Sequence, residues 1–269
     1  MSSRLTREAA PAPRAVGAGR GFTLIEVLVV LVIMTVLLSG IAVPLAAQLQ
    51  MRRMGEARRQ LDEAKEAVLG FAAVNGRLPC PAVEGSNGLE SFAPGGDAAN
   101  GNCASFYAGY LPGATLGLAP LDGDGLVRDP WMSARNRIRY AVFGAGTQVN
   151  GVVNPLTRGN GMQDATLAGL GAAPRFLMIC STGREASASD CGPAANQLTR
   201  RAAFLLLSLG PNAQATPAPS SDEARNIAGN PVFVYRDPSN VPGSEFDDLV
   251  QWVPVHLVVN RLIVAGRLP

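Results

Sequence analysis

The stretch RGFTLIEVLVVLVIMTVLLSGIAVPLAA, residues 20–47, decides the N-terminal part of the fold. The 21 residues 27–47 carry no charge, which is long enough for a helix to cross a bilayer. One acid, Glu26, stands at the head of this run. A carboxylate near the centre of a membrane helix costs about 2.5–3.5 kcal/mol on insertion scales, and such residues are usually functional. Glu26 is therefore the first candidate functional residue.

Basic residues flank the uncharged run on both sides, so their number alone does not orient it in a membrane. They are Arg4, Arg7, Arg14 and Arg20 before the run and Arg52, Arg53, Arg58 and Arg59 after it. Residues 1–21 hold only one acid, and the remaining 248 residues hold 19 basic and 20 acidic side chains. A secretory signal peptide is the alternative, but the run is longer than an ordinary apolar signal region and begins with an acid.

The rest of the chain has the composition of a globular domain. Its 269 residues are 47% hydrophobic, which is enough to bury a sizeable core. No basic patch with interleaved aromatic residues follows the leader, so we expect no nucleic-acid partner.

The four cysteines, Cys80, Cys103, Cys180 and Cys191, fit two disulfides. Of the three connectivities, we predict the sequential pairs Cys80–Cys103 and Cys180–Cys191. Disulfides indicate an oxidising compartment such as a periplasm. The alternative is four buried thiols in a cytosolic protein. A zinc site is not expected, because the chain has one histidine and no CxxC spacing.

The segment GFTLIE, residues 21–26, resembles the cleavage and methylation motif of type IV prepilins and of type II secretion pseudopilins. The resemblance rests on a basic leader that ends in Gly, followed by Phe, by Glu four residues later and by an apolar run. It implies cleavage after Gly21 by a prepilin peptidase and N-methylation of the new terminus, Phe22. It also implies an inner-membrane, single-pass protein with a periplasmic head, which an inner-membrane assembly platform then draws into a periplasmic or surface filament.

The resemblance gives Glu26 a role in filament assembly. In a filament the apolar helices bundle away from water, and a carboxylate among them needs a partner. The family's proposed partner is the terminal amine of a neighbouring pilin or pseudopilin subunit, here Phe22 of the next chain. The alternative is that Glu26 lies at the headgroup boundary of the membrane and only snorkels.

The chain after residue 47 continues as an amphipathic helix. One face carries apolar residues spaced by threes and fours: Met54, Ala57, Leu61, Ala64, Val68 and Phe71. We divide the chain into a cleaved leader (1–21), an apolar half (22–47) and an amphipathic half (48–76) of one long helix, and a periplasmic head (77–269). The expected fold is α+β and pilin-like: the long N-terminal helix packs on an antiparallel β-sheet head with long loops pinned by disulfides.

Short apolar or alternating runs predict strands at residues 137–143, 175–181, 202–210 and 231–237. Residues 249–266 read as two strands, or as a strand and a short helix, with a weak break at residues 260–261. Pro254 within this run indicates an edge strand or a bulge. Residues 213–225 read as a polar, proline-rich loop.

A second resemblance concerns calcium. The segments at 208–212 (SLGPN) and 246–252 (FDDLVQW) resemble the C-terminal calcium loop of major pseudopilins, which implies Ser208, Asp247 and Asp248 as ligands. The two segments lie far apart here, and a further apolar run follows, which departs from the family pattern. The alternative is that Asp247 and Asp248 cap a turn. Residues 121–130 lack the third acid and the final Glu of an EF-hand, so turn chemistry explains them.

We expect no enzymatic activity and no cofactor other than Ca²⁺. The only histidine, His256, lies in a strand-like apolar run, and no GxSxG, phosphate-binding glycine loop or HExxH is present. The predicted function is a structural filament subunit, either a pseudopilin or a minor pilin. The alternative is a membrane-anchored periplasmic binding or enzymatic domain with a prepilin-like anchor.

Overall fold

A computed structural model describes residues 21–131, 136–213, 216–219 and 221–269, with the side chains of residues 38–47 outside the description. The predicted leader therefore lies outside the described residues, except for Gly21. Contacts divide the chain into two compact units, residues 1–50 and 51–269. The second half of the long helix thus belongs to the same compact unit as the head.

The first helix, α1 (Leu24–Asn75), runs through both units. Within the second unit, its buried face consists of Ala57, Leu61, Ala64, Val68, Leu69 and Ala72. Four of these residues belong to the predicted apolar stripe, whose other members, Met54 and Phe71, are only half-buried. The alanines leave room for close packing against the sheet. The helix ends at Asn75 because Gly76 takes the left-handed conformation, with φ of 68°. Arg267 then donates hydrogen bonds to the free carbonyls of Ala73 and Val74.

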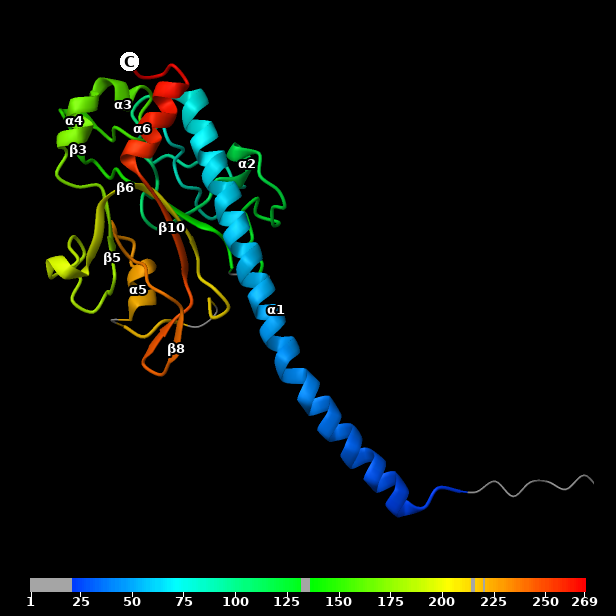
Figure 1. Cartoon of the computed structure of the whole chain (residues 1–269). Helices are drawn as coiled ribbons and strands as arrows, with labels where there is room; N and C mark the ends of the chain where they lie inside the picture. Colours follow the sequence, from blue (N-terminus) through cyan, green and yellow to red (C-terminus); the bar gives the residue numbers. More distant parts are fainter. Residues whose placement is uncertain (1–20, 132–135, 214–215, 220) are drawn as a thin grey trace, which may run out of the picture. The chain divides into compact units, whose positions relative to one another are not determined.

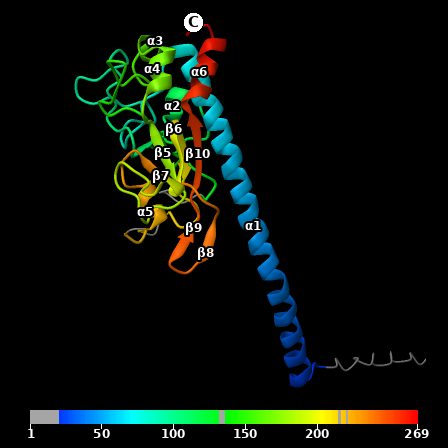
Figure 2. The ribbon, with the colours of Figure 1, turned by 60° about the vertical axis from the view of Figure 1, so that its left-hand side comes forward.

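A six-stranded sheet forms the centre of the second unit (Figures 1 and 2). Its strands are β1 (Gly109–Tyr110), β2 (Arg139–Val142), β5 (Leu177–Cys180), β6 (Gln197–Ser208), β7 (Val232–Val234) and β10 (Leu249–Pro254). The long strand β6 is central: it pairs with β10 along one edge and with β2 and then β5 along the other. Its second half is fully buried, since strands flank it on both sides and α1 belongs to the same core.

The sheet differs from the antiparallel sheet predicted from the sequence. Strands β5 and β7 pair in parallel, with Ile179 opposite Phe233, whereas the other pairs in the sheet are antiparallel. The long connection between β5 and β7 passes through β6, which allows β7 to return in the direction of β5. The sheet is therefore mixed.

Residues 249–266, predicted as two strands or as a strand and a short helix, form a strand and a helix. Strand β10 gives way directly to helix α6 (Val255–Val264). The break falls at Pro254, where the pairing with β6 also shifts register, and not at residues 260–261. Pro cannot donate to the strand ladder but fits a helix start. His256 therefore lies exposed in the first turn of a helix, which corrects the strand predicted for it.

The remaining elements are short. They are α2 (Gly113–Leu116), β3 (Gln148–Val149), β4 (Val152–Val153), α3 (Gly161–Asp164), α4 (Leu167–Ala172), η1 (Ala194–Asn196), α5 (Asp222–Asn226), β8 (Ser239–Val241) and β9 (Ser244–Phe246). Helix α5 corrects the loop predicted over residues 213–225: Ser221 caps it by accepting a hydrogen bond from the backbone NH of Ala224, 3.1 Å away.

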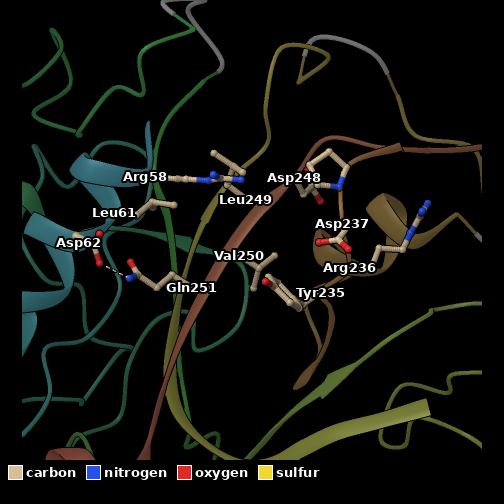
Figure 3. Close-up of a pocket in the computed structure, with 11 residues that line it drawn as sticks. Arg58, Leu61, Asp62, Tyr235, Arg236, Asp237, Asp248, Leu249, Val250 and Gln251 are labelled. Atoms are coloured by element: carbon tan, nitrogen blue, oxygen red, sulfur yellow. Dashed lines mark hydrogen bonds between the residues drawn. The ribbon is translucent and has the colours of Figure 1, made fainter. Parts of the chain in front are cut away.

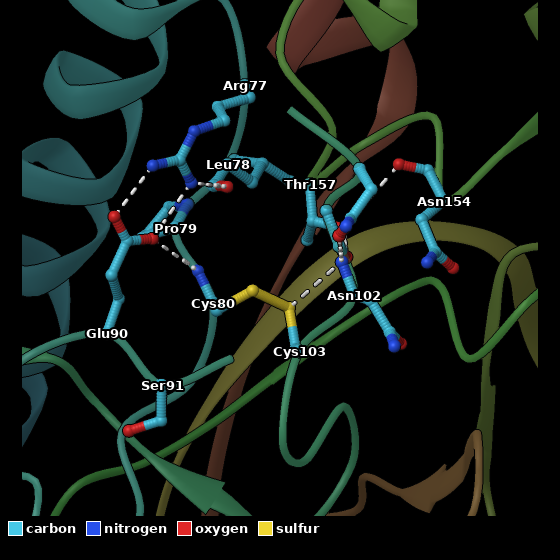
Figure 4. The surroundings of a disulfide bond; sticks show 12 residues. Arg77, Leu78, Pro79, Cys80, Glu90, Ser91, Asn102, Cys103, Asn154 and Thr157 are labelled. Carbon is cyan, nitrogen blue, oxygen red and sulfur yellow. Dashed lines mark hydrogen bonds and ion pairs between the residues drawn. A yellow bond between two sulfur atoms is a disulfide. The ribbon is translucent and has the colours of Figure 1, made fainter. Parts of the chain in front are cut away.

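The disulfides have the predicted sequential pairing, Cys80–Cys103 and Cys180–Cys191. Beside the first, the buried guanidinium of Arg77 donates two hydrogen bonds to Glu90, at 2.8 and 2.6 Å (Figure 4). Glu90 also accepts a hydrogen bond from the backbone NH of Cys80, 3.1 Å away. Because the buried charges are paired and hydrogen-bonded, the chain leaving α1 is held to the loop that the disulfide closes.

Candidate functional site

The motif at the N-terminus builds the start of α1. Residues 21–23 are not helical, and Thr23 accepts hydrogen bonds from the backbone NH of Glu26 at its hydroxyl (3.3 Å) and at its carbonyl (3.1 Å). Thr23 is thus the N-cap, and Thr-x-x-Glu is the sequence pattern of a capping box. This pattern is a local sequence signal for a helix start, and it was not among the predictions made from the sequence. An acid in the first turn also suits the partial positive charge of the helix N-terminus.

The residues named by the motif have no structural role within the described chain beyond that cap. Phe22 is 81% exposed. A side chain added at Gly21 would meet nothing within 4 Å, so packing does not explain the glycine. The carboxylate of Glu26 is exposed and forms no hydrogen bond or ion pair with a described residue. These residues are available to partners outside the chain.

Large apolar side chains cover the first part of α1 on all sides, together with Phe22 just before it, and all of them are exposed. They are Phe22, Leu24, Ile25, Val27, Leu28, Val29, Val30, Leu31, Val32, Ile33, Met34, Val36 and Leu37. A helix that is apolar all round is normally buried, in a protein core or in a membrane. Exposed apolar surface of this extent marks an interaction site.

The predicted membrane span, 27–47, includes residues 38–47, whose side chains lie outside the description. Among the residues that the structure describes, no helix combines the length and the apolar character needed to cross a membrane.

A second candidate site consists of three carboxylates in the head. Glu223 on α5 and Asp247 and Asp248, which lie between β9 and β10, bring one oxygen each to within 4.8 Å of one another. Asn212 donates hydrogen bonds of 3.2 Å to both oxygens of Glu223, and the backbone NH of Asp247 donates one of 3.1 Å. These contacts hold the cluster in place but do not neutralise its three carboxylates.

One oxygen in this cluster has no partner. The Oδ1 atom of Asp247 is buried and accepts no hydrogen bond from a described residue. A buried acceptor without a donor is costly. Gly210 lies against it: a Cβ there would be 2.5 Å from Oδ1. Gly210 also takes a left-handed φ of 65°, so both the conformation and the close approach require glycine.

The electrostatics of the cluster favour a cation. Burial raises the pKa of Asp247 to about 7, and the negative charge of Glu223 adds to the shift. Burial raises the pKa of Asp248 to about 8, against the stabilising hydrogen bond that its Oδ2 accepts from Asn226 (2.7 Å). Both carboxylates therefore hold protons more tightly than usual, and a divalent cation would replace those protons.

The structure brings together Asp247 and Asp248 of the predicted set, but the hydroxyl of Ser208 makes other contacts. It donates a hydrogen bond to Asp129, 2.8 Å away, and accepts one from the backbone NH of Gly210. Glu223, which the sequence analysis did not name, stands beside the two aspartates. No local pattern could have identified Glu223, because it reaches the cluster from a short helix 24 residues earlier in the chain.

A pocket of about 420 Å³ separates the second half of α1 from β10 and residues 235–238 (Figure 3). The pocket mixes acidic, basic and apolar side chains, and Gln251 of β10 lines it. The Nε2 atom of Gln251 donates a 2.6 Å hydrogen bond to Asp62 of α1, while its Oε1 atom is buried without a partner among the described residues. Its volume lies within the range of small-molecule sites, but its lining is more polar than the apolar walls typical of such sites.

A family model, the prokaryotic N-terminal methylation motif, matches residues 18–42. The chain carries the signature of type IV prepilin-like proteins. The match begins in the leader and covers Gly21, Phe22 and Glu26. No curated protein and no solved structure matches the chain.

The prepilin-like signature has consequences for partners and location. It implies processing by a prepilin peptidase and assembly with other pilin-like subunits, and it suggests a membrane-anchored or extracellular filament protein. The motif is found in structural subunits, which are generally not enzymes. The fold beyond the motif is a mixed sheet with an N-terminal helix and two disulfides, and it has no structural neighbour that would mark it as pilin-like.

The raised pKa values predict how the stability of the calcium-free protein depends on pH. Asp247 and Asp248 titrate at about 7 and 8 when folded and at about 3.9 when unfolded. The folded state therefore binds more protons between these values, and the free energy of unfolding falls as the pH rises from about 5 to about 8. Thermal unfolding in a calcium chelator measures this.

Asp248→Asn is the matched variant, since its amide oxygen can still accept the hydrogen bond from Asn226. We expect it to unfold at a higher temperature than the unsubstituted protein at pH 8 and at a similar temperature at pH 5. A stability that rises over this range, or an unchanged slope in the variant, would contradict the shifted pKa values.

Proposed function

We propose that the chain is a structural subunit, a pseudopilin or minor pilin, of a type II secretion or type IV pilus filament. It is processed after Gly21, N-methylated at Phe22 and assembled through its N-terminal helix. The observation that carries the proposal is the exposed apolar surface of residues 22–37, which lies within the matched methylation motif, residues 18–42. A single chain cannot cover such a surface, so lipid or the helices of other subunits must do so.

The route to the filament follows from the same features. The apolar segment holds the subunit in the inner membrane, with a single span and with the head in the periplasm. This location agrees with the two disulfides, which persist in oxidising compartments. The partners on this route are the prepilin peptidase, an inner-membrane assembly platform and other pilin or pseudopilin subunits.

Glu26 has a specific role in this proposal. Its carboxylate stands at the head of the apolar surface and has no partner among the described residues. In a bundle of apolar helices, the amine of Phe22 on the next subunit would supply the opposite charge. Because an unpaired charge in such surroundings is costly, the pair would favour one axial register between neighbouring subunits.

We also propose that Glu223, Asp247 and Asp248 bind Ca²⁺ in the head. Calcium takes six to eight oxygen ligands, which carboxylates, backbone carbonyls and water supply. Support comes from the three converging carboxylates, the partnerless buried oxygen of Asp247 and the raised pKa values. Ser208 remains a proposed ligand as well, since its hydroxyl donates to Asp129 and its oxygen can still face a cation.

The second candidate function is an anchored periplasmic binding domain. It is favoured by the pocket beside β10, which has the volume of a ligand site and contains an unpaired buried oxygen on Gln251. Removal of the leader does not separate the two candidates if the anchor is prepilin-like in both. Contact between subunits does, because a solitary anchored domain requires none.

Processing gives the first test. In cells that contain a prepilin peptidase, we expect a mature N-terminus at Phe22 that is about 14 Da heavier than the unmodified residue. The intact mass and the N-terminal peptide measure both changes. Gly21→Leu should leave the chain uncut, whereas Gly55→Ala, a change on the exposed face of α1, should be processed normally. A mature terminus elsewhere would exclude the proposed cleavage site.

Assembly tests the role of Glu26. Glu26→Ala should leave the protein in the membrane but lower its incorporation into filaments roughly tenfold or more, since the partner charge is left unpaired. Chemical crosslinking between subunits measures incorporation. Glu56→Ala, which removes an exposed acid from the same helix, is the control. Normal crosslinking of the Glu26 variant would remove its role in register.

Calcium should raise the stability of the head. At a concentration one hundred times its Kd, a ligand adds about 2.7 kcal/mol to the free energy of unfolding, which corresponds to a rise in Tm of roughly 5–10 °C for a domain of this size. Thermal unfolding with calcium, with magnesium and with chelator measures the effect. Glu223→Gln should reduce the rise, while Glu245→Gln, an exposed neighbour on β9, should not. An equal rise in both variants would refute the ligand set.

A further inference from the structure

Four arginines cluster on α1 at the start of the second unit: Arg52, Arg53, Arg58 and Arg59. All four side chains are exposed, and none forms an ion pair or hydrogen bond through its guanidinium with a described residue. Among residues 51–60, Glu56 is the only acid. The next acid, Asp62, is engaged with Lys65 and Gln251. We refer to the four arginines as the arginine collar.

The collar is spread widely around the helix. A helical residue turns by about 100°, so Arg52 and Arg59 lie nearly in line, while Arg53 and Arg58 lie on either side of them. The buried stripe, represented by Ala57 and Leu61, is opposite the first pair. The collar therefore covers the exposed part of the circumference. A folded protein partner would contact one side of this helix, whereas a planar surface through which the helix passes would contact all of it.

The position of the collar along the chain fits such a surface. Arg52 follows the uncharged run 27–47 by five residues. By helical rise, Arg52 lies about 8 Å beyond Ala47 and Arg59 about 18 Å beyond it, whereas the headgroup region on one side of a bilayer is roughly 5–8 Å thick. Arg52 therefore stands at the outer edge of that region, and Arg58 and Arg59 reach toward it because helical side chains lean toward the helix N-terminus. Arginine can also bend its apolar stem along the helix and place its guanidinium among phosphates.

We infer that the arginine collar binds the headgroups of anionic phospholipids while the subunit waits in the membrane. The inference rests on the proposed function, because it requires the apolar half of α1 to lie in a bilayer. Each basic side chain near an anionic surface adds attraction, and guanidinium groups bind phosphate with paired hydrogen bonds. The collar thereby gives the anchored subunit a preference for anionic over neutral lipid.

The experiment uses the full mature chain in lipid nanodiscs of phosphatidylethanolamine with a minority of phosphatidylglycerol. The phospholipids that stay bound to the released protein are counted by native mass spectrometry. We expect phosphatidylglycerol to be enriched, and the double variant R52Q/R59Q to lose most of the enrichment, because two of the four attractive charges are removed. Added salt should weaken the enrichment in the unsubstituted protein.

The control R128Q/R200Q removes the same charge from exposed arginines of the head and should keep the enrichment. Equal binding of both phospholipids, or an unchanged enrichment in R52Q/R59Q, would overturn the inference and leave the filament proposal standing. So would a variant that keeps its lipid but loses crosslinks to other subunits, because the collar would then serve a protein partner. A mature chain that fails to enter nanodiscs of either lipid would overturn the inference together with the membrane anchor of the proposed function.

Discussion

The structure depends on one constraint: the first part of α1, residues 24–37, exposes apolar side chains on every side. Burying such a side chain contributes about 1.5–3 kcal/mol, so a dozen of them outweigh the stability of a typical domain. The segment is therefore suited to an apolar environment and not to water. Because Glu26 lies at its start, that environment must supply an opposite charge there or end at a polar interface.

The second half of the same helix packs against the sheet of the head. It presents a stripe on which alanines alternate with Leu61 and Val68, and this stripe forms part of the core that contains the central strand β6. At the far end, Gly76 stops the helix, and Arg267 and the Arg77–Glu90 pair hold it to the C-terminus and to the disulfide loop. A force or displacement applied to this half of the helix would reach the sheet directly, because no flexible linker intervenes.

Local patterns predicted much of this architecture. The apolar spacing in α1, the end of the helix near residue 76 and the runs that became β2, β5, β6 and β7 depend on near neighbours in the chain. The disulfide pairs are the closest in sequence. Features set by distant segments were missed. The parallel pairing of β7 with β5 depends on where β6 lies, and Glu223 meets Asp247 only after α5 has packed against the sheet. The break at Pro254 was misplaced because the apolar run continues through it.

Helix α5 shows why the acidic cluster and the edge of the sheet belong together. The side-chain amide of Asn226 accepts a hydrogen bond from the backbone NH of Val234 (2.7 Å) and donates one to its carbonyl (3.2 Å), so it closes the outer edge of β7 as a further strand would. The same amide donates to Asp248, and the same helix carries Glu223. Neutralising the cluster, by protons or by a cation, would therefore relieve repulsion between α5 and the start of β10 and strengthen the closure of β7. A change in the charge of the carboxylates would therefore also affect the edge strand. Glu223 of the cluster and Asn226, which covers the edge of β7, both belong to the five-residue helix α5.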